Sequence, residues 1–284
     1  MPHIAYLGTG LLGSAFVEAA LARGDQVTVW NRTAIKTQPL ERLGATAAGT
    51  PADAVRDAVR VHLVLRDDDS VDDVIAQCRM ALPAESIVVD HTTTLPRRTA
   101  ERADRLQREG IRYLHCPVFI GPAAARKGEG TIVVSGRTDL FDAVRPALQE
   151  QATRVEYLGE RPDLAAVHKL VGNAFIVGIC GLVADALAVG KGADVASSDL
   201  LETLTWFNSA NVVAGRGRAM VRGDFAPGFE LTMARKDLQL MMETAGPDAL
   251  AMLPGLAARM DALLAEGHHQ DDLAVVGLRS VHAE

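Results

Sequence analysis

Aromatic side chains are scarce in this chain of 284 residues, which has two tryptophans, three tyrosines and seven phenylalanines. Proteins that hold single-stranded nucleic acid use such rings as stacking platforms and combine them with a basic surface. Here the net charge is -7 and the pI is about 5.6. The composition therefore argues against nucleic-acid binding, although it leaves room for a local basic pocket that holds a phosphate.

Cysteine is also rare. Cys78, Cys116 and Cys180 are scattered and form no CxxC pair, which is typical of reduced thiols in a cytoplasm. The first residues, "MPHIAYLGTG", contain neither a basic segment nor a long apolar one, so no signal peptide is expected. We expect a cytoplasmic protein.

Long uninterrupted apolar segments are missing as well. The most apolar stretch, 174–184, is bounded by Asn173 and Asp185, and we expect it to be too short to cross a membrane. No metal is expected, because His268 and His269 have no carboxylates at the spacing of metal ligands. The acidic run at 67–73 is interpreted as solvated carboxylates at a helix start.

Strand and helix patterns alternate through the first half of the chain. Short β-branched runs predict strands near 3–7, 26–30, 61–65, 86–90, 112–116, 131–135 and 154–159, with helical patterns between them. This order predicts an α/β domain with a doubly wound, mostly parallel sheet of the Rossmann type, over residues 1–160. Length alone also favours about two domains.

From residue 161 to 284 only helical patterns remain, at 164–190, 197–211, 231–246 and 247–267. The first of these would be a long interdomain helix that opens an all-helical domain for substrate binding and dimerisation. It is apolar nearly all round, so we expect most of its surface to be buried. A domain this small can hardly cover it alone, and we therefore predict a homodimer or a homotetramer.

A glycine-rich turn follows the first predicted strand. "GTGLLG" places Gly8, Gly10 and Gly13, with Leu11 and Leu12, at the start of a helix. In this spacing the first glycine makes a tight turn, the second lets a pyrophosphate approach, and the third lets helix and strand pack closely. The free N–H groups of the helix start then attract the phosphates. The segment predicts a dinucleotide site.

The second predicted strand ends in Asn31, Arg32 and Thr33. NAD sites usually place an acidic residue here, which binds the ribose hydroxyls. Without that carboxylate, Arg32 can pair with a 2′-phosphate, and Asn31 and Thr33 can hydrogen-bond it. NADP is therefore the predicted cofactor.

With three further segments, "DHTTTLP", "HKLVGN" and "RKDLQL", the chain resembles the β-hydroxyacid dehydrogenase family along nearly its whole length. This family includes 3-hydroxyisobutyrate dehydrogenases and tartronate semialdehyde reductases and, more distantly, phosphogluconate dehydrogenases and imine reductases. The resemblance implies that Thr92 and Thr93 lie near the nicotinamide. It also implies that Lys236 reaches the cofactor region and that Asp237 supports it.

The resemblance gives Lys169 and Asn173 the catalytic positions. Residues four apart share one face of a helix, so both side chains would point into the cleft. Lys169 would donate a proton to a developing alkoxide, and Asn173 would hold the substrate oxygen or orient the lysine. The alternative is that Lys169 merely extends from a core helix to the surface.

The segment "HCPVFIGP" departs from the family, which binds a substrate carboxylate with a serine and glycines there. Phe119 and Ile120 replace the serine and the first glycine, whereas Pro117, Val118 and Gly121 agree with the family. Gly172 replaces one of two paired asparagines. A more apolar substrate pocket is expected, to which Trp206 of this or a neighbouring subunit could contribute; Trp206 could also be a core residue.

The sequence thus predicts an NADP-dependent oxidoreductase that transfers hydride between the cofactor and a small carbonyl or hydroxy compound. An imine reductase is the main alternative: Lys169 argues against it, because those relatives usually carry Asp or Tyr there, whereas Phe119 and Ile120 favour it. A non-catalytic NADP-binding protein is the third possibility. The sequence does not name the substrate or the physiological direction, and it does not distinguish dimer from tetramer.

Overall fold

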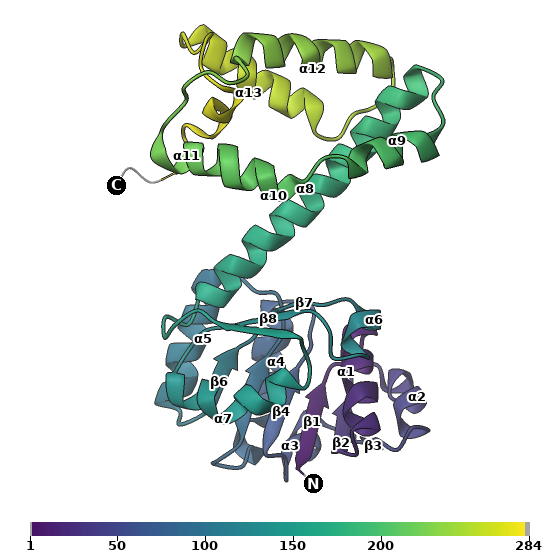
Figure 1. Cartoon of the computed structure of the whole chain (residues 1–284). Coiled ribbons are helices and arrows are strands. Elements are labelled where there is room, and N and C mark those ends of the chain that lie inside the picture. Colours follow the sequence, from purple (N-terminus) through teal and green to yellow (C-terminus); the bar gives the residue numbers. More distant parts are fainter. Residues whose placement is uncertain (1, 282–284) are drawn as a thin grey trace. The chain divides into compact units, whose positions relative to one another are not determined.

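The computed structural model describes residues 2–281. They form two compact units, the first ending at Asn173 and the second beginning at Ala174. The division falls inside helix α8 (Leu164–Gly192), which contributes its first residues to one unit and the rest to the other (Figure 1).

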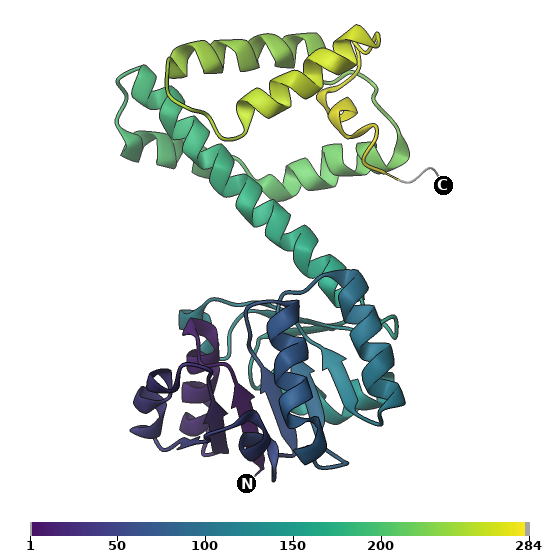
Figure 2. The same ribbon diagram turned by 180° about the vertical axis from the view of Figure 1, so that it is seen from behind.

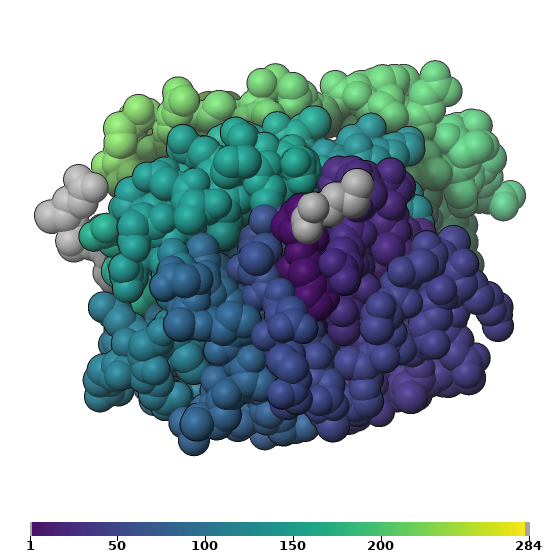
Figure 3. Space-filling model, turned by 90° about the horizontal axis from the view of Figure 1, so that it is seen from below, coloured from purple at the N-terminus to yellow at the C-terminus, as the bar shows by residue number. Residues whose placement is uncertain are grey.

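A six-stranded parallel sheet forms the centre of the first unit, with strand order β3-β2-β1-β4-β5-β6. This confirms the predicted doubly wound fold. Figure 3 views the molecule from the amino ends of these strands, where the purple amino-terminal segment lies between blue and teal parts of the first unit. The strands are β1 (His3–Leu7), β2 (Gln26–Trp30), β3 (Thr46–Ala47), β4 (Arg60–Leu63), β5 (Ile87–Asp90) and β6 (Arg112–His115).

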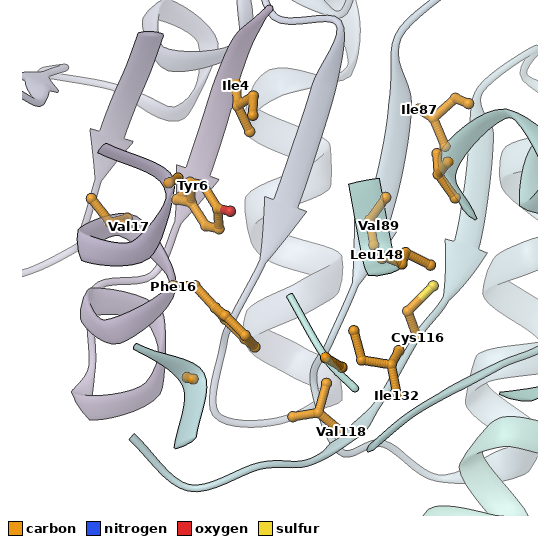
Figure 4. Packing of buried hydrophobic residues seen from close by; sticks show 14 of the residues in the cluster. Ile4, Tyr6, Phe16, Val17, Ile87, Val89, Cys116, Val118, Ile132 and Leu148 are labelled. Atoms are coloured by element: carbon orange, nitrogen blue, oxygen red, sulfur yellow. The ribbon is translucent and has the colours of Figure 1, made fainter. Parts of the chain in front are cut away.

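Helices cover both faces of this sheet (Figures 1 and 2). Because side chains alternate along a strand, Ile4 and Tyr6 pack with α1 and α7 on one face, while Ala5 and Leu7 pack with α3, α4 and α5 on the other. Figure 4 shows part of the first cluster. The helices are α1 (Leu11–Ala22), η1 (Ala34–Lys36), α2 (Gln38–Glu41), α3 (Pro51–Val55), α4 (Asp68–Cys78), η2 (Arg79–Ala81), α5 (Pro96–Arg108), α6 (Pro122–Ala125) and α7 (Thr138–Gln149).

The last strands of this unit leave the main sheet. Strands β7 (Val118–Phe119), β8 (Thr131–Val134) and β9 (Arg154–Tyr157) form a separate three-stranded sheet. The strand pattern predicted one continuous series, and the structure differs after Cys116, whose N–H still donates to the backbone oxygen of Asp90 at 2.7 Å, because the next residue, Pro117, has no N–H with which to continue the ladder. The new sheet carries Val118 and Phe119 to the start of α8.

The second unit is helical, as predicted. One helix had been expected over 247–267, but α13 begins only at Leu253, because the buried carboxylate of Asp185 accepts hydrogen bonds from the N–H groups of Ala251, Met252 and Leu253 at 2.6, 2.8 and 2.9 Å. The elements are α9 (Ser197–Thr205), α10 (Ser209–Val212), η3 (Val213–Gly217), α11 (Arg218–Arg222), α12 (Leu231–Ala245), α13 (Leu253–Ala265) and η4 (Leu273–Gly277).

Helix α8 overturns one expectation, the one on its length. It has 29 residues and an 18-residue window of mean hydropathy 2.0, so by length and composition alone it could cross a membrane; Asn173 and Asp185 lie within the helix and do not end it. Only 6% of that window is buried within the chain, and the predicted burial of this helix by a second copy stays a prediction. Val171 and Val177 are 66% and 69% exposed. A single chain therefore leaves this apolar surface uncovered.

Candidate cofactor and active site

Three glycines at the carboxyl end of β1 have three different constraints. Gly8 has φ +105°, and an added Cβ would lie 2.2 Å from the backbone oxygen of Val64. An added Cβ on Gly13 would lie 2.0 Å from the oxygen of Gly8. Gly10 has nothing within 4 Å of such a Cβ. The turn and the helix–strand packing therefore require Gly8 and Gly13, while the bare backbone at Gly10 faces open space.

Helix α1 begins directly after Gly10, which is its N-cap. No side chain caps this helix start, and its first turn carries no acidic residue. Its first N–H groups and the positive end of the helix dipole are therefore available to an anion. Together with the open backbone at Gly10, this arrangement fits the pyrophosphate of a dinucleotide.

Gly10 and Gly13 allow stability and cofactor binding to be separated. We expect Gly13→Ala to destabilise the fold by roughly 1–3 kcal/mol, because the new methyl group would collide with Gly8. Gly10→Ala should leave the melting temperature nearly unchanged but weaken NADPH binding by at least ~10-fold, about the loss of one hydrogen bond. Thermal unfolding and NADPH fluorescence titration test this, and normal NADPH affinity in Gly10→Ala would contradict the cradle.

The glycine loop opens onto a cavity of about 630 Å³ in the first unit. Most of the residues predicted to bind cofactor line it: Gly8, Gly10, Leu11, Leu12, Gly13, Asn31, Arg32, Thr33 and Thr93. Lys169 and Ile120 line the same cavity. One continuous space thus connects the glycine cradle with the predicted proton donor.

The end of β2 supplies cations to this cavity. The side chains of Arg32 and Lys36 are exposed and make no hydrogen bond or ion pair with any residue in 2–281. The lining carboxylate, Asp73, comes from α4 and not from the end of β2. The sequence interpretation missed Lys36, which the "NRTAIK" segment could have indicated as a second cation one turn beyond Thr33.

Asn31 joins the glycine loop to the loop that follows β2. Its Oδ1 accepts a hydrogen bond from the N–H of Thr9 at 3.1 Å, and its Nδ2 donates to the oxygen of Thr33 at 3.0 Å. Thr92 is likewise held inside the protein, because it is 2% exposed and its hydroxyl accepts from the N–H of Leu65 at 3.1 Å. Thr92 does not line the cavity, and direct cofactor contacts of Asn31 and Thr92 stay predictions.

Two buried histidines lie beneath the cavity, which His91 lines. Because the oxygen of Cys116 can only accept, His91 donates to it from Nδ1 at 2.7 Å and accepts at Nε2 from Nδ1 of His62 at 2.9 Å. Burial lowers the pKa of His91 to about 4 and the pKa of His62 well below its usual value. With both ring nitrogens engaged and no charge at neutral pH, His91 is unsuited to proton transfer. The sequence interpretation did not include His91 among the residues that line the cavity.

Lys169 is half-buried in α8 and its ammonium group is held by oxygen atoms. Nζ donates to the backbone oxygen of Val118 at 2.7 Å and to Oδ1 of Asn173 at 2.9 Å. Burial lowers the pKa of Lys169. The i, i+4 spacing thus brings Lys169 and Asn173 into a hydrogen bond on one face of α8, and whether Asn173 orients the lysine or holds the substrate oxygen stays a prediction.

The remaining predicted site residues lie outside this cavity. Gly121 is the N-cap of α6 and is exposed. In the second unit, Lys236 and Asp237 of α12 form an ion pair at 2.8 Å. Trp206 is 72% exposed, so it is not a core residue of this chain. The roles of Lys236, Asp237 and Trp206 toward cofactor or substrate stay predictions.

Comparison with known families matches both parts of the chain. Residues 3–159 match the family described as the NAD binding domain of 6-phosphogluconate dehydrogenase. Residues 164–278 match the family described as NAD-binding of NADP-dependent 3-hydroxyisobutyrate dehydrogenase. The chain belongs to the 3-hydroxyisobutyrate dehydrogenase-like oxidoreductases. This confirms the resemblance, the fold class and the expectation that the chain binds NAD(P).

Among relatives of this dehydrogenase-like chain, an uncharacterized oxidoreductase of Shewanella frigidimarina is 28% identical over 250 residues, covering 86% of each chain. An NADPH-dependent reductive aminase of Aspergillus oryzae is 26% identical and covers 96% of this chain and 95% of its own. The solved structure of an imine reductase from Myxococcus stipitatus in complex with NADP+ superposes with a TM-score of 0.87 at 22% identity, covering 97% and 98%. The last likeness concerns the fold.

Proposed function

We propose that this oxidoreductase reduces a small, largely apolar carbonyl or imine compound with NADPH, and that Lys169 donates the proton. The observation that carries the proposal is the position of Lys169, which lines the cavity of the glycine cradle, is half-buried and has its Nζ 2.9 Å from Oδ1 of Asn173. If Lys169 merely extended from a core helix to the surface, its Nζ would reach bulk water. Its two protein acceptors argue for a fixed and functional position.

The proposed chemistry divides between cofactor and protein. When bound, NADPH supplies the hydride. The glycine loop and the start of α1 hold the pyrophosphate, while Arg32 and Lys36 hold the 2′-phosphate. Lys169 gives its proton to the oxygen or nitrogen of the substrate and takes one up in the reverse direction. Burial favours proton transfer by Lys169, because it lowers the pKa of the side chain toward neutral pH.

The cofactor preference rests on Arg32 and Lys36. We expect NADPH to bind more tightly than NADH, and Arg32→Ala to reduce this preference by roughly 1–3 kcal/mol, the range for a charge-assisted hydrogen bond. The name of the Aspergillus relative, an NADPH-dependent reductive aminase, supports NADP. Titration with both cofactors tests the prediction, with exposed Arg56, which pairs with Asp53, changed to alanine as the control. Equal affinities for both cofactors in the unaltered protein would refute it.

Imine reduction is the second candidate. Ile120 lines the cavity together with Lys169, and the ring of Phe119 lies 4.4 Å from Nζ of Lys169; neither side chain provides a hydroxyl group. Such side chains suit an apolar substituent better than a carboxylate. The reductive aminase activity in the name of the Aspergillus relative also supports this candidate.

For the assembly we propose a homodimer or homotetramer in which a second copy covers α8. The support is the exposed apolar surface of this helix, which water disfavours. Lys169 and Asp185 on the same helix are fixed by polar contacts within the protein, which argues against lipid as the covering phase. A cytoplasmic location is proposed from the three unpaired cysteines.

The experiment that tests the function is hydride transfer from deuterated cofactor. Purified protein with NADPH carrying deuterium at C4 is incubated with a panel of aldehydes, 2-oxo acids and cyclic imines, and products are analysed by mass spectrometry. Deuterium on the former carbonyl or imine carbon of at least one compound is expected. Tight NADPH binding without transfer to any compound would instead favour the non-catalytic alternative.

A further inference from the structure

Phe119 and Gly172 form a close pair although 53 positions separate them in the sequence. A Cβ added to Gly172 would lie 2.4 Å from both Cε1 and Cζ of the Phe119 ring, so the ring rests against the bare Cα of the glycine. Gly172 lies inside α8, where glycine is the least favourable residue after proline. The contact with the ring supplies a reason for glycine at this position.

The same ring contacts the proposed proton donor. Nζ of Lys169 lies 4.4 Å from the centroid of Phe119, within the distance of about 6 Å at which a cation is attracted to an aromatic face. An ammonium group has three N–H donors, and two of them go to Val118 and Asn173. The third N–H is left for the substrate, and the ring lies beside the ammonium group as its third neighbour.

We propose that Phe119 is a positioning residue: its ring, admitted by the missing side chain at Gly172, holds the Lys169 ammonium against Val118 and Asn173. The proposal rests on the proposed role of Lys169 as proton donor. Gly172 and Phe119 are then a matched pair, since a larger residue at 172 would push the ring away from Nζ.

A cation–π contact has a consequence that plain packing lacks. The ring attracts only the protonated form of the lysine, so it favours that form. Burial acts in the opposite direction and lowers the pKa of Lys169. The contact therefore keeps a buried lysine protonated at a higher pH than burial alone would permit, and it extends the pH range in which Lys169 can donate a proton.

The test is a titration of Lys169 in which the shape of the ring is kept and its electrons are withdrawn. Phenylalanines with increasing numbers of fluorine atoms are placed at position 119 by codon suppression. The chain has only five lysines, so ¹³C labelling at Cε gives few signals, and the spectrum of Lys169→Arg assigns the one of interest. The measurement needs neither substrate nor cofactor.

We expect the pKa of Lys169 to fall stepwise with fluorination, by roughly 0.4–1.5 in total, which corresponds to the strength of such contacts. Phe119→Leu and Gly172→Ala should lower it in the same direction, the second although alanine favours a helix. Fluorination of Phe141, whose ring contacts Arg145 at 4.7 Å, is the matched control and should leave Lys169 unaffected.

An unchanged or raised pKa of Lys169 across the fluorinated series would overturn the proposal. That failure differs from failure of the proposed function, which is measured by deuterium transfer. If Phe119 positions Lys169 but Lys169 does not donate the proton, the titration shifts and the Lys169 variants keep their turnover. If Lys169 donates the proton without the ring, turnover is lost in those variants and the titration is flat.

Discussion

Lys169→Ala is expected to lower turnover by at least ~10², the usual loss when a general acid is removed. NADPH affinity should change little, because the charged parts of the cofactor are assigned to the glycine loop and to Arg32. Lys169→Arg should fail to restore activity, since arginine keeps the charge but does not release its proton near neutral pH. Asn173→Ala should cost less than Lys169→Ala, because Asn173 orients the lysine.

The direction in which turnover changes with pH also tests the role of Lys169. In reduction, Lys169 must be protonated, so turnover is expected to be present at low pH and lost as the pH rises through the pKa of Lys169, which burial places below its usual value. This limb of the profile should vanish in Lys169→Ala. Steady-state kinetics across pH measure it, with the exposed Lys191→Ala on the same helix as control. Full activity in Lys169→Arg would show that the catalytic assignment is wrong.

The double variant Ile176→Glu, Val177→Glu is expected to convert the oligomer into monomers. Both residues lie on α8 and are 53% and 69% exposed in the single chain, so burying two carboxylates there would oppose association. A stable interface buries about 1,200–2,000 Å² or more, and two unpaired charges within it cost several kcal/mol. Sedimentation velocity at micromolar concentration measures the change.

Met80→Glu is the matched control, because Met80 is 91% exposed and belongs to η2 of the first unit rather than to α8. It should leave the oligomer intact. A monomer in the unaltered protein would refute the assembly. If the protein stays in solution only when detergent or lipid is added, a membrane and not a second copy covers α8.

Local patterns predicted the parts of the site that depend on neighbouring residues. The spacing of Gly8 and Gly13 follows from the turn itself, and the spacing of Lys169 and Asn173 follows from the helical repeat. Both are present as predicted because their geometry is set within a few positions of the chain. The parallel sheet followed for the same reason, from the alternation of strand and helix.

Features that depend on distant partners could not be predicted. The acidic run at 67–73 was expected to be solvated, yet Asp68 is 6% exposed and binds the buried Arg102 at 2.8 Å. Arg102 also holds Asp72 at 2.9 Å. Only the packing of α5 on α4 brings these charges together. The pairing of Phe119 with Gly172 escaped sequence analysis in the same way, although both residues stood out singly as departures from the family.

The cap that Asp185 provides for α13 has a consequence during synthesis. Its three partners lie 66 to 68 positions downstream, so the carboxylate stays without them until the chain has been extended past Leu253. At about 5–20 residues per second the ribosome needs roughly 3–14 s for those 68 residues. For that time α8 has emerged without the helix that its carboxylate caps. The newly made chain therefore exposes, within its most apolar helix, a carboxylate that the complete fold buries, until α13 has been synthesised.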